Sequence, residues 1–217
     1  MQIKLLLQHP LIDIWLVWFG NDMKLSNIIR ALDIFKVPFY ILDINELQNN
    51  KYCFAIVIPT DKLAQFRGVQ QPINVKQTGV YIINCDVYTF YEASKSTNPE
   101  GIAQIEQIIR DNFGVFESEY YLAFAVFSIL HEVGHIKHLE KSKMTYEEYY
   151  DTYQKEWDNL YREYLFVYKI YATTPERIKA VNQLYGEKYR GHPFENFADH
   201  FALKHFEECM QKIHDIE

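Results

Sequence analysis

The feature that most restricts the fold of this chain is a helical segment that is apolar on almost all of its faces. Residues 118–140 contain no proline, and from Tyr121 to Leu130 nearly every side chain is apolar or small. A helix without a polar face has to be surrounded by other elements to keep it from water. The sequence therefore predicts that this helix lies in the core and that the rest of the chain covers it.

The length and composition are sufficient for such a core. The chain has 217 residues, of which 48% are hydrophobic and 16% aromatic, and its formal net charge is −7 at pH 7. This length suits one core of good size, so we expect a single domain over residues 1–217. We expect residues 1–98 to form an α/β part and residues 99–217 a helical part. The acidic balance argues against nucleic-acid binding, which requires many lysines and arginines.

Cysteine usage and the N-terminal residues favour a cytoplasmic protein without a membrane partner. Cys53, Cys85 and Cys209 are far apart and form no Cys-x-x-Cys pair, so we expect buried free thiols in a reducing compartment. The apolar run Leu11–Phe19 is interrupted by Asp13 and is too short to span a bilayer. The oligomeric state is left open by the sequence.

Short runs with strand character dominate the first hundred residues. Between the first two of them, apolar residues recur at helical spacing from Leu25 to Phe35, which predicts a β-α-β unit. The glycine- and glutamine-rich segment Gly68–Gly79 is typical of a loop. The expected strands are Ile12–Phe19, Val37–Ile44, Tyr52–Ile58 and Val80–Asn84.

The remaining residues have helical character, with proline at three of the predicted helix starts. We therefore expect an α+β fold, in which a small mixed sheet packs on a helical C-terminal half. Gly186 and Gly191 are expected to lie in a turn before the last helix. The expected helices run from Pro99 to about Asn112, from about Ser118 to Glu140, from Tyr146 to about Tyr171, from Pro175 to about Tyr185 and from about Pro193 to Ile213.

The buried helix carries the sequence His-Glu-Val-Gly-His at residues 131–135. Residues four apart lie on one face of a helix, so His131 and His135 can reach one metal ion at about 2.0–2.1 Å. Glu132 lies about 100° around the helix, where it can act as a general base towards an activated water. A chance match to this pattern is expected only about 0.02–0.03 times in such a chain, and two unpartnered imidazoles are costly to bury.

A zinc site of the catalytic type needs three protein ligands, and Glu195 is the best third candidate. Asp199 follows it by one helical turn, where a carboxylate can hold a ligating histidine by its other ring nitrogen. Small residues at Ala198 and Ala202 would let this helix pack closely against the helix that carries the two histidines. Glu195 is also suited to a helix N-terminus, and the two roles are compatible. Zinc is preferred over manganese or cobalt from the ligand types alone.

These two segments resemble the gluzincin class of zinc peptidases. The sequence Glu-Asn-Phe-Ala-Asp-His-Phe-Ala at residues 195–202 is similar to a signature of the ImmA/IrrE family of bacterial and phage regulatory peptidases, and His138 matches a histidine often found in that family. Both segments also resemble the catalytic domain of anthrax lethal factor. The resemblance implies a zincin-like fold with His131, His135 and Glu195 as zinc ligands and Glu132 as the base. About sixty residues separate His135 from Glu195, which is longer than expected for ImmA-like proteins.

The function expected from these residues is hydrolysis of a peptide bond in a protein or peptide substrate. A peptidase also needs a hydrogen-bond donor for the developing oxyanion. Tyr189 is our first candidate for that donor, and Tyr185, His192 and His205 are the others. An alternative is a regulatory or protein-binding module that keeps the fold but does not cleave, and a toxin-like effector is a third interpretation.

Overall fold

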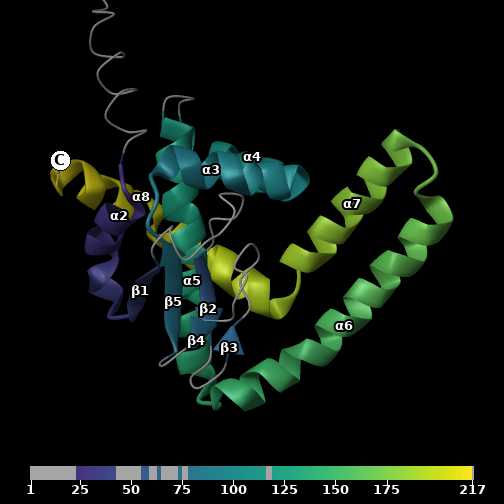
Figure 1. The fold of residues 1–217 in the computed structure, drawn as a ribbon, viewed down its shortest axis with the longest axis horizontal. Helices are drawn as coiled ribbons and strands as arrows, with labels where there is room; N and C mark the ends of the chain where they lie inside the picture. The colour runs from purple at the N-terminus through teal and green to yellow at the C-terminus, as the bar shows by residue number, and fades with distance from the viewer. Residues whose placement is uncertain are drawn as a thin grey trace, which may run out of the picture.

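The computed structural model describes residues 23–42, 55–58, 63–64, 73–74, 78–115 and 119–216. Within these residues the architecture is α+β, as predicted, with a small mixed sheet in the N-terminal half and helices in the C-terminal half (Figure 1). The expected strand Ile12–Phe19 lies outside the described residues, as does Cys53. Cys85 and Cys209 are buried free thiols, as expected.

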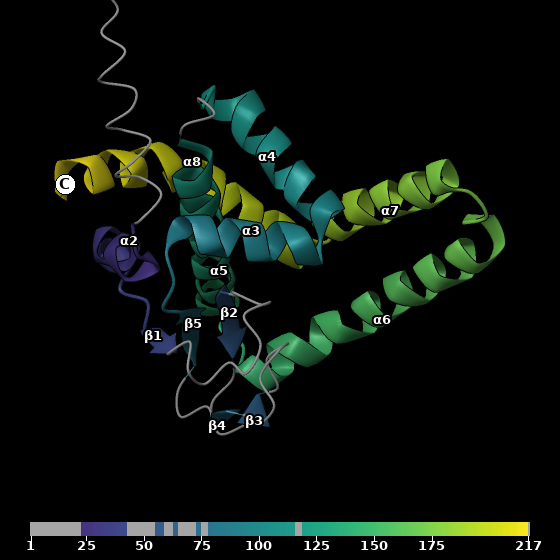
Figure 2. The same cartoon turned by 45° about the horizontal axis from the view of Figure 1, so that its top comes forward.

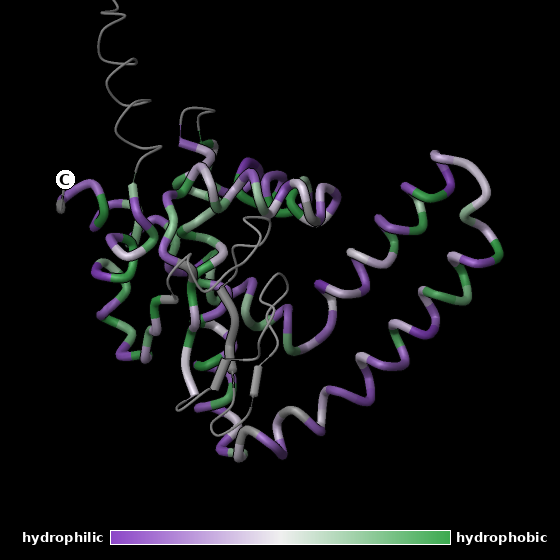
Figure 3. Tube along the Cα trace, in the orientation of Figure 1, coloured by the Kyte–Doolittle hydropathy of each residue, from purple (hydrophilic) through white to green (hydrophobic). Residues whose placement is uncertain are grey.

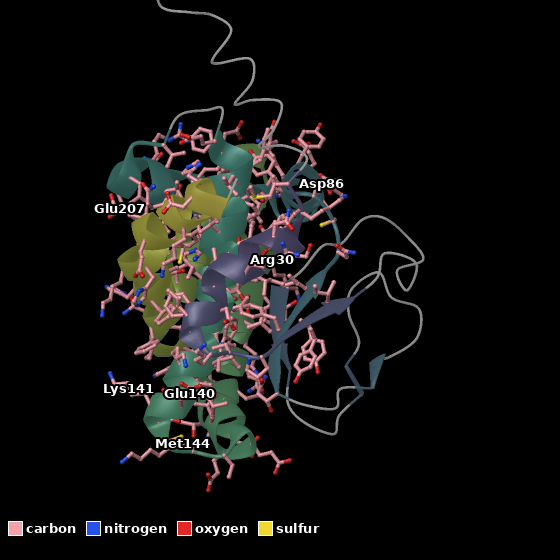
Figure 4. All side chains as sticks on the ribbon, turned by 90° about the vertical axis from the view of Figure 1, so that its left-hand side faces the viewer. Arg30, Asp86, Glu140, Lys141, Met144 and Glu207 are labelled. Atoms are coloured by element: carbon pink, nitrogen blue, oxygen red, sulfur yellow. The ribbon has the colours of Figure 1, made fainter. Side chains whose placement is uncertain are left out.

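Helix α5 (Tyr120–Ser142) is the central element, which confirms the prediction made from its apolar surface. Its buried side chains include Phe124, Phe127 and Leu130. Helix α8 (Pro193–Ile216) packs along one side of it and the sheet lies on the other side (Figure 4). Although α5 is strongly apolar, neither it nor any other described helix is long and apolar enough to cross a membrane.

The sheet has three strands in the order β1-β5-β2. Strand β5 (Gly79–Ile83) lies in the middle, parallel to β1 (Phe39–Leu42) and antiparallel to β2 (Ala55–Ile58). The mixed sheet is thus confirmed. The prediction that Gly68–Gly79 is a loop was wrong at Ile73–Asn74, because this strand, β4, pairs with Leu63–Ala64, strand β3.

Helices α2 (Leu25–Leu32) and α4 (Pro99–Phe113) agree with the sequence analysis. A further helix, α3 (Val87–Thr97), was not predicted. Its sequence is rich in Val, Tyr, Thr and Ser, which have low helix propensity, so tertiary packing outweighs local preference there. The carboxylate of Asp86 accepts a hydrogen bond from the backbone N–H of Thr89 at 2.7 Å and caps its first turn. A short 3₁₀ helix, η1 (Asp33–Phe35), extends α2.

Helices α6 (Tyr146–Tyr171) and α7 (Pro175–Arg190) form an antiparallel hairpin that projects from the body (Figures 1 and 2), and we call it the arm. Helix α6 begins with a capping box between Thr145 and Glu148. Hydrophilic residues predominate in α6 as it leaves the body (Figure 3).

Helix α7 is longer than the sequence indicated, since Gly186 lies inside it rather than in a turn. A Cβ at position 186 would meet the end of the flexible Gln104 side chain, so α7 and α4 lie close together at this point. The arm therefore contacts the body through α7 before the chain turns into α8.

Candidate metal centre

The candidate metal centre forms where α5 and α8 approach most closely. Gly134 faces Ala198 at this point, and a Cβ at position 134 would lie 2.7 Å from the Cα of Ala198 and 3.0 Å from its carbonyl oxygen. Real Cβ atoms do not come so near to backbone atoms, so only glycine permits this spacing. The close approach that the small residues predicted is confirmed, with Ala198 and Ala202 fully buried. It brings Glu195 on α8 opposite the two histidines of α5.

His131, His135 and Glu195 direct their ligating atoms towards a common point. The Nε2 atoms of the two imidazoles are 3.1 Å apart. Oxygens of Glu195 lie 3.1 Å from Nε2 of His131 and 3.8 Å from Nε2 of His135. Tetrahedral ligands at about 2.0–2.1 Å from zinc lie roughly 3.3 Å from one another, so these three spacings fit such an ion. Within the described residues this is the group whose geometry could hold a metal.

Asp199 and Arg190 orient His131 through its second ring nitrogen, Nδ1. Nδ1 of His131 is 2.8 Å from Oδ1 of Asp199, as predicted. The guanidinium of Arg190 donates to both oxygens of Asp199, at 2.6 and 2.9 Å. Because Asp199 accepts the proton on Nδ1, Nε2 is the nitrogen left to face a metal. Arg190 was not identified from the sequence, since only the tertiary packing of α7 against α8 brings it to Asp199.

His135 is held by stacking. Its ring lies on the ring of Phe194, with centroids 4.0 Å apart and planes at 30°. Its Nδ1 is buried and has no hydrogen-bond partner in the part of the chain that the structure describes. The orientation of the His135 ring is therefore fixed mainly by packing, whereas that of His131 is fixed by its hydrogen bond to Asp199.

The two histidines differ in charge when no metal is bound. Burial lowers the pKa of His131, but its hydrogen bonds to Asp199 and Glu195 outweigh burial and raise that pKa to about 10. Burial, followed by the charge of His131, holds the pKa of His135 well below its usual value. The pKa of Asp199 is also lowered, because its contacts with His131 and Arg190 outweigh its own burial. At neutral pH His135 is thus ready to coordinate, whereas His131 has to release a proton first.

We expect His131 in the metal-free protein to remain an imidazolium at pH 8, while His135 stays neutral at pH 6. The folded pKa of His131 is raised, so its contribution to the stability of the metal-free protein is complete below pH 6.5 and is lost as pH rises towards 10. Imidazole chemical shifts followed by NMR between pH 5 and pH 9 would measure both groups. Titration of His131 near pH 6.5 would contradict this expectation.

A cleft of about 570 Å³ opens beside the candidate ligands. Its lining includes His131, Glu195 and Glu132, and Glu132 is half-buried on the wall formed by α5. Tyr189 also lines the cleft, close to the carboxylate of Glu195. Burial, and then the charge of Glu195, raise the pKa of Tyr189 well above its usual value, so its hydroxyl keeps its proton and can donate. The base and donor candidates therefore face the same space as the ligands.

The sequence also named Tyr185, His192 and His205 as candidate oxyanion donors, and only the tyrosine lines the cleft. Tyr185 lines the cleft one turn away from Tyr189. His192 is buried and its Nε2 is 3.2 Å from a carboxylate oxygen of Glu156 on α6. His205 packs edge-on against Phe35, at 4.9 Å between centroids. Neither histidine is part of the cleft lining, so the structure does not support them as oxyanion donors.

His138 has a packing role one turn beyond His135. Its Nδ1 is 2.7 Å from the hydroxyl of Tyr149, and its ring stacks on Phe197 with centroids 4.4 Å apart. These contacts join α5 to both α6 and α8. His138 therefore positions the helices around the centre without reaching the metal ligands.

The contact between Arg190 and Asp199 is expected to tighten metal binding. Replacing Arg190 with Met should weaken zinc affinity about 10- to 100-fold, because Asp199 would lose the charge that holds it towards His131. Arg190→Lys should restore part of this affinity, since one guanidinium nitrogen makes both hydrogen bonds. Competition with a chromogenic chelator would measure the affinities. Lys188→Met is a matched control, because Lys188 pairs with Glu163 on the surface of the arm, and an equal loss in this variant would refute the role of Arg190.

Comparison with known proteins finds no match: no family model fits the chain, and no curated protein or solved structure is significantly similar to it. The function of the chain is therefore inferred from the geometry of the site and from the resemblance of its two short segments.

Proposed function

We propose that this protein is a zinc-dependent peptidase of the gluzincin type with a zincin-like fold. His131, His135 and Glu195 would hold the ion, and Glu132 would be the general base. The observation that carries the proposal is the convergence of three ligand atoms of suitable type and spacing beside a cleft that also contains Glu132 and Tyr189. The substrate would be a protein or peptide.

The ligand set fits zinc by its chemistry as well as by its spacing. Two imidazoles and one carboxylate are the three protein ligands found in one class of catalytic zinc sites. The chemistry that zinc would supply there is the activation of a water molecule for attack and the polarisation of the substrate's carbonyl group. Asp199 and Arg190 keep His131 in the tautomer that leaves Nε2 free for the ion.

The residues of the chain supply proton transfer and charge stabilisation. Glu132 would take the proton of the attacking water and later pass it to the departing amine of the peptide. Tyr189 would donate its hydroxyl proton in a hydrogen bond to the carbonyl oxygen as negative charge develops on it. The low-polarity surroundings that raise the pKa of Tyr189 also strengthen such a hydrogen bond.

Elemental analysis of the purified protein, followed by a screen against a broad peptide library, tests the proposal. We expect one zinc per chain in the parent protein, a large loss of zinc in Glu195→Ala, and metal-dependent cleavage of some peptides. Stoichiometric zinc without turnover of any peptide would favour the alternative of a non-cleaving regulatory or protein-binding module. Absence of metal binding by the parent protein would overturn the proposal.

Removing the Tyr189 hydroxyl should separate catalysis from metal binding. We expect Tyr189→Phe to retain zinc and to lower kcat about 10²- to 10³-fold, with a smaller effect on KM, because the donor acts mainly in the transition state. Steady-state kinetics on a peptide identified in the screen would measure both constants. Tyr171→Phe removes a hydroxyl from the exposed end of α6 and should keep kcat within a few-fold of the parent. An unchanged kcat in Tyr189→Phe would exclude the donor role.

A further inference from the structure

Apart from the candidate metal ligands, much of the lining of the cleft is apolar. Its floor is formed by α5 and includes Phe124 and Phe127, and Phe90 of α3 and Ile102 of α4 extend this apolar surface. All four side chains belong to the buried hydrophobic core. The part of the cleft away from the ligands is therefore lined at depth by hydrocarbon and aromatic rings.

The arm forms the opposite wall of the same cleft. Tyr164 of α6 and Tyr185 of α7 both line it, and their ring centroids are 4.4 Å apart. The hydroxyl of Tyr164 donates a hydrogen bond of 3.0 Å to the side-chain oxygen of Asn182 on α7. These contacts fix the two rings relative to each other, so the aromatic wall is formed before any ligand arrives.

The polar residues of the lining separate into two groups. Those next to the ligands, such as Arg190, are already engaged in the metal centre. The others come from several elements. On α4 and at its N-terminal end they are Glu100, Gln104 and Asn98, and the side-chain oxygen of Asn98 already accepts a hydrogen bond from the backbone N–H of Gly101. Side-chain amides can hydrogen-bond with the N–H and C=O groups of an extended backbone. The approach of α7 to Gln104 at Gly186 limits the cleft on that side.

We propose that the arm and α4 together select an extended segment of the substrate that carries one large aliphatic or aromatic side chain beside the scissile bond. This inference rests on the proposed peptidase function and assigns its substrate class. An acidic side chain would lose its hydration between the tyrosines and the isoleucines, in a cleft whose lining already contains the carboxylates of Glu100 and Glu132. An apolar side chain instead removes its own surface and that of the wall from water.

The test uses the zinc-loaded full chain and three peptide hydroxamates that differ only in one side chain, namely that of Phe, Ala or Asp. Their dissociation constants are measured by isothermal titration calorimetry. Burial of a Phe side chain contributes about 1.5–3 kcal/mol, so the Phe compound should bind about 10- to 100-fold more tightly than the Ala compound, and the Asp compound should bind most weakly. Equal affinities for the three compounds would overturn the inference.

Variants of residues that line the cleft test whether the cleft causes the preference for the Phe compound. Ile105→Asp should abolish the preference for the Phe compound, whereas Ala103→Asp, which places the same charge on an exposed position of α4, should leave it unchanged. Because a charge near the core can impair folding, Tyr185→Ser provides a second variant on the arm and should reduce the preference several-fold. A preference that persists in both Ile105→Asp and Tyr185→Ser would refute the assignment to this cleft.

Acetohydroxamate, a compound without a side chain, shows whether the substrate class alone is wrong or the peptidase proposal as a whole. If it binds the zinc-loaded protein while the three peptide compounds show no selectivity, only the substrate class is wrong. If the protein takes up no zinc, the peptidase proposal fails and the substrate class fails with it.

Discussion

Replacing Glu132 with glutamine is expected to lower the rate of peptide hydrolysis about 10²- to 10⁴-fold while the protein keeps its metal. Glutamine has nearly the same shape but cannot accept the proton of the attacking water. Glu132 lines the cleft beside His131 and Glu195 without being one of the three converging ligands, so metal affinity should change little. Initial rates on a cleaved peptide, together with zinc content, would measure the two effects separately.

A matched control for this variant exists on the same helix. Glu140 is exposed near the end of α5 and pairs with Lys137 at 2.7 Å, so Glu140→Gln removes one negative charge away from the cleft. We expect this variant to keep full activity. Full activity in Glu132→Gln would rule out the proposed mechanism, whereas loss of zinc in that variant would indicate that Glu132 is itself a ligand.

Gly134→Ala should destabilise the protein by about 1–3 kcal/mol and weaken zinc binding at least about tenfold. The added methyl group has no space, since it would meet the backbone of Ala198 at 2.7 Å and the Cβ of Phe201 at 3.1 Å. The two helices would have to separate, and Glu195 would then move away from both imidazoles. Urea unfolding of the metal-free protein and chelator competition would measure the two effects.

Gly191→Ala is the corresponding control. Gly191 is exposed and has a negative φ of −72°, and the nearest atom to its Cβ position is a carbonyl oxygen at 3.3 Å. Its substitution should change stability by no more than about 0.5 kcal/mol. If Gly134→Ala proved equally mild, the close approach of α5 and α8 would not be the feature that sets the ligand spacing.

The convergence of the site residues was predictable because it depends on local periodicity. His131 and His135 lie on one face of α5 by helix geometry alone, and so do Glu195 and Asp199 on α8. The small residues at Ala198 and Ala202 then indicated that these two helices would pack closely. Arg190 could not be found in this way, since nothing near it in the sequence specifies a buried carboxylate as its partner.

The fold was predictable to a similar degree and for similar reasons. The apolar surface of α5 required a central position. The helix predicted from Tyr146 to about Tyr171, ending before the Thr-Pro sequence, has the bounds that α6 shows. Helix α3 was missed because its residues favour strands locally, and the end of α7 was misplaced because Gly186 lies inside the helix, against α4, and not in a turn. In both elements tertiary contacts decide against local preference.

The arm lies in the sequence between the two segments that carry the candidate metal ligands, and its tip at residues 172–174 is at the surface. Cutting the chain there would yield one fragment with both histidines and another with Glu195, Asp199 and Arg190. Neither fragment alone would contain a full coordination set, so zinc could be retained only while the two halves remain assembled. The molecule is thus suited to conversion into a split protein, in which recovery of the bound ion reports the complementation of its fragments.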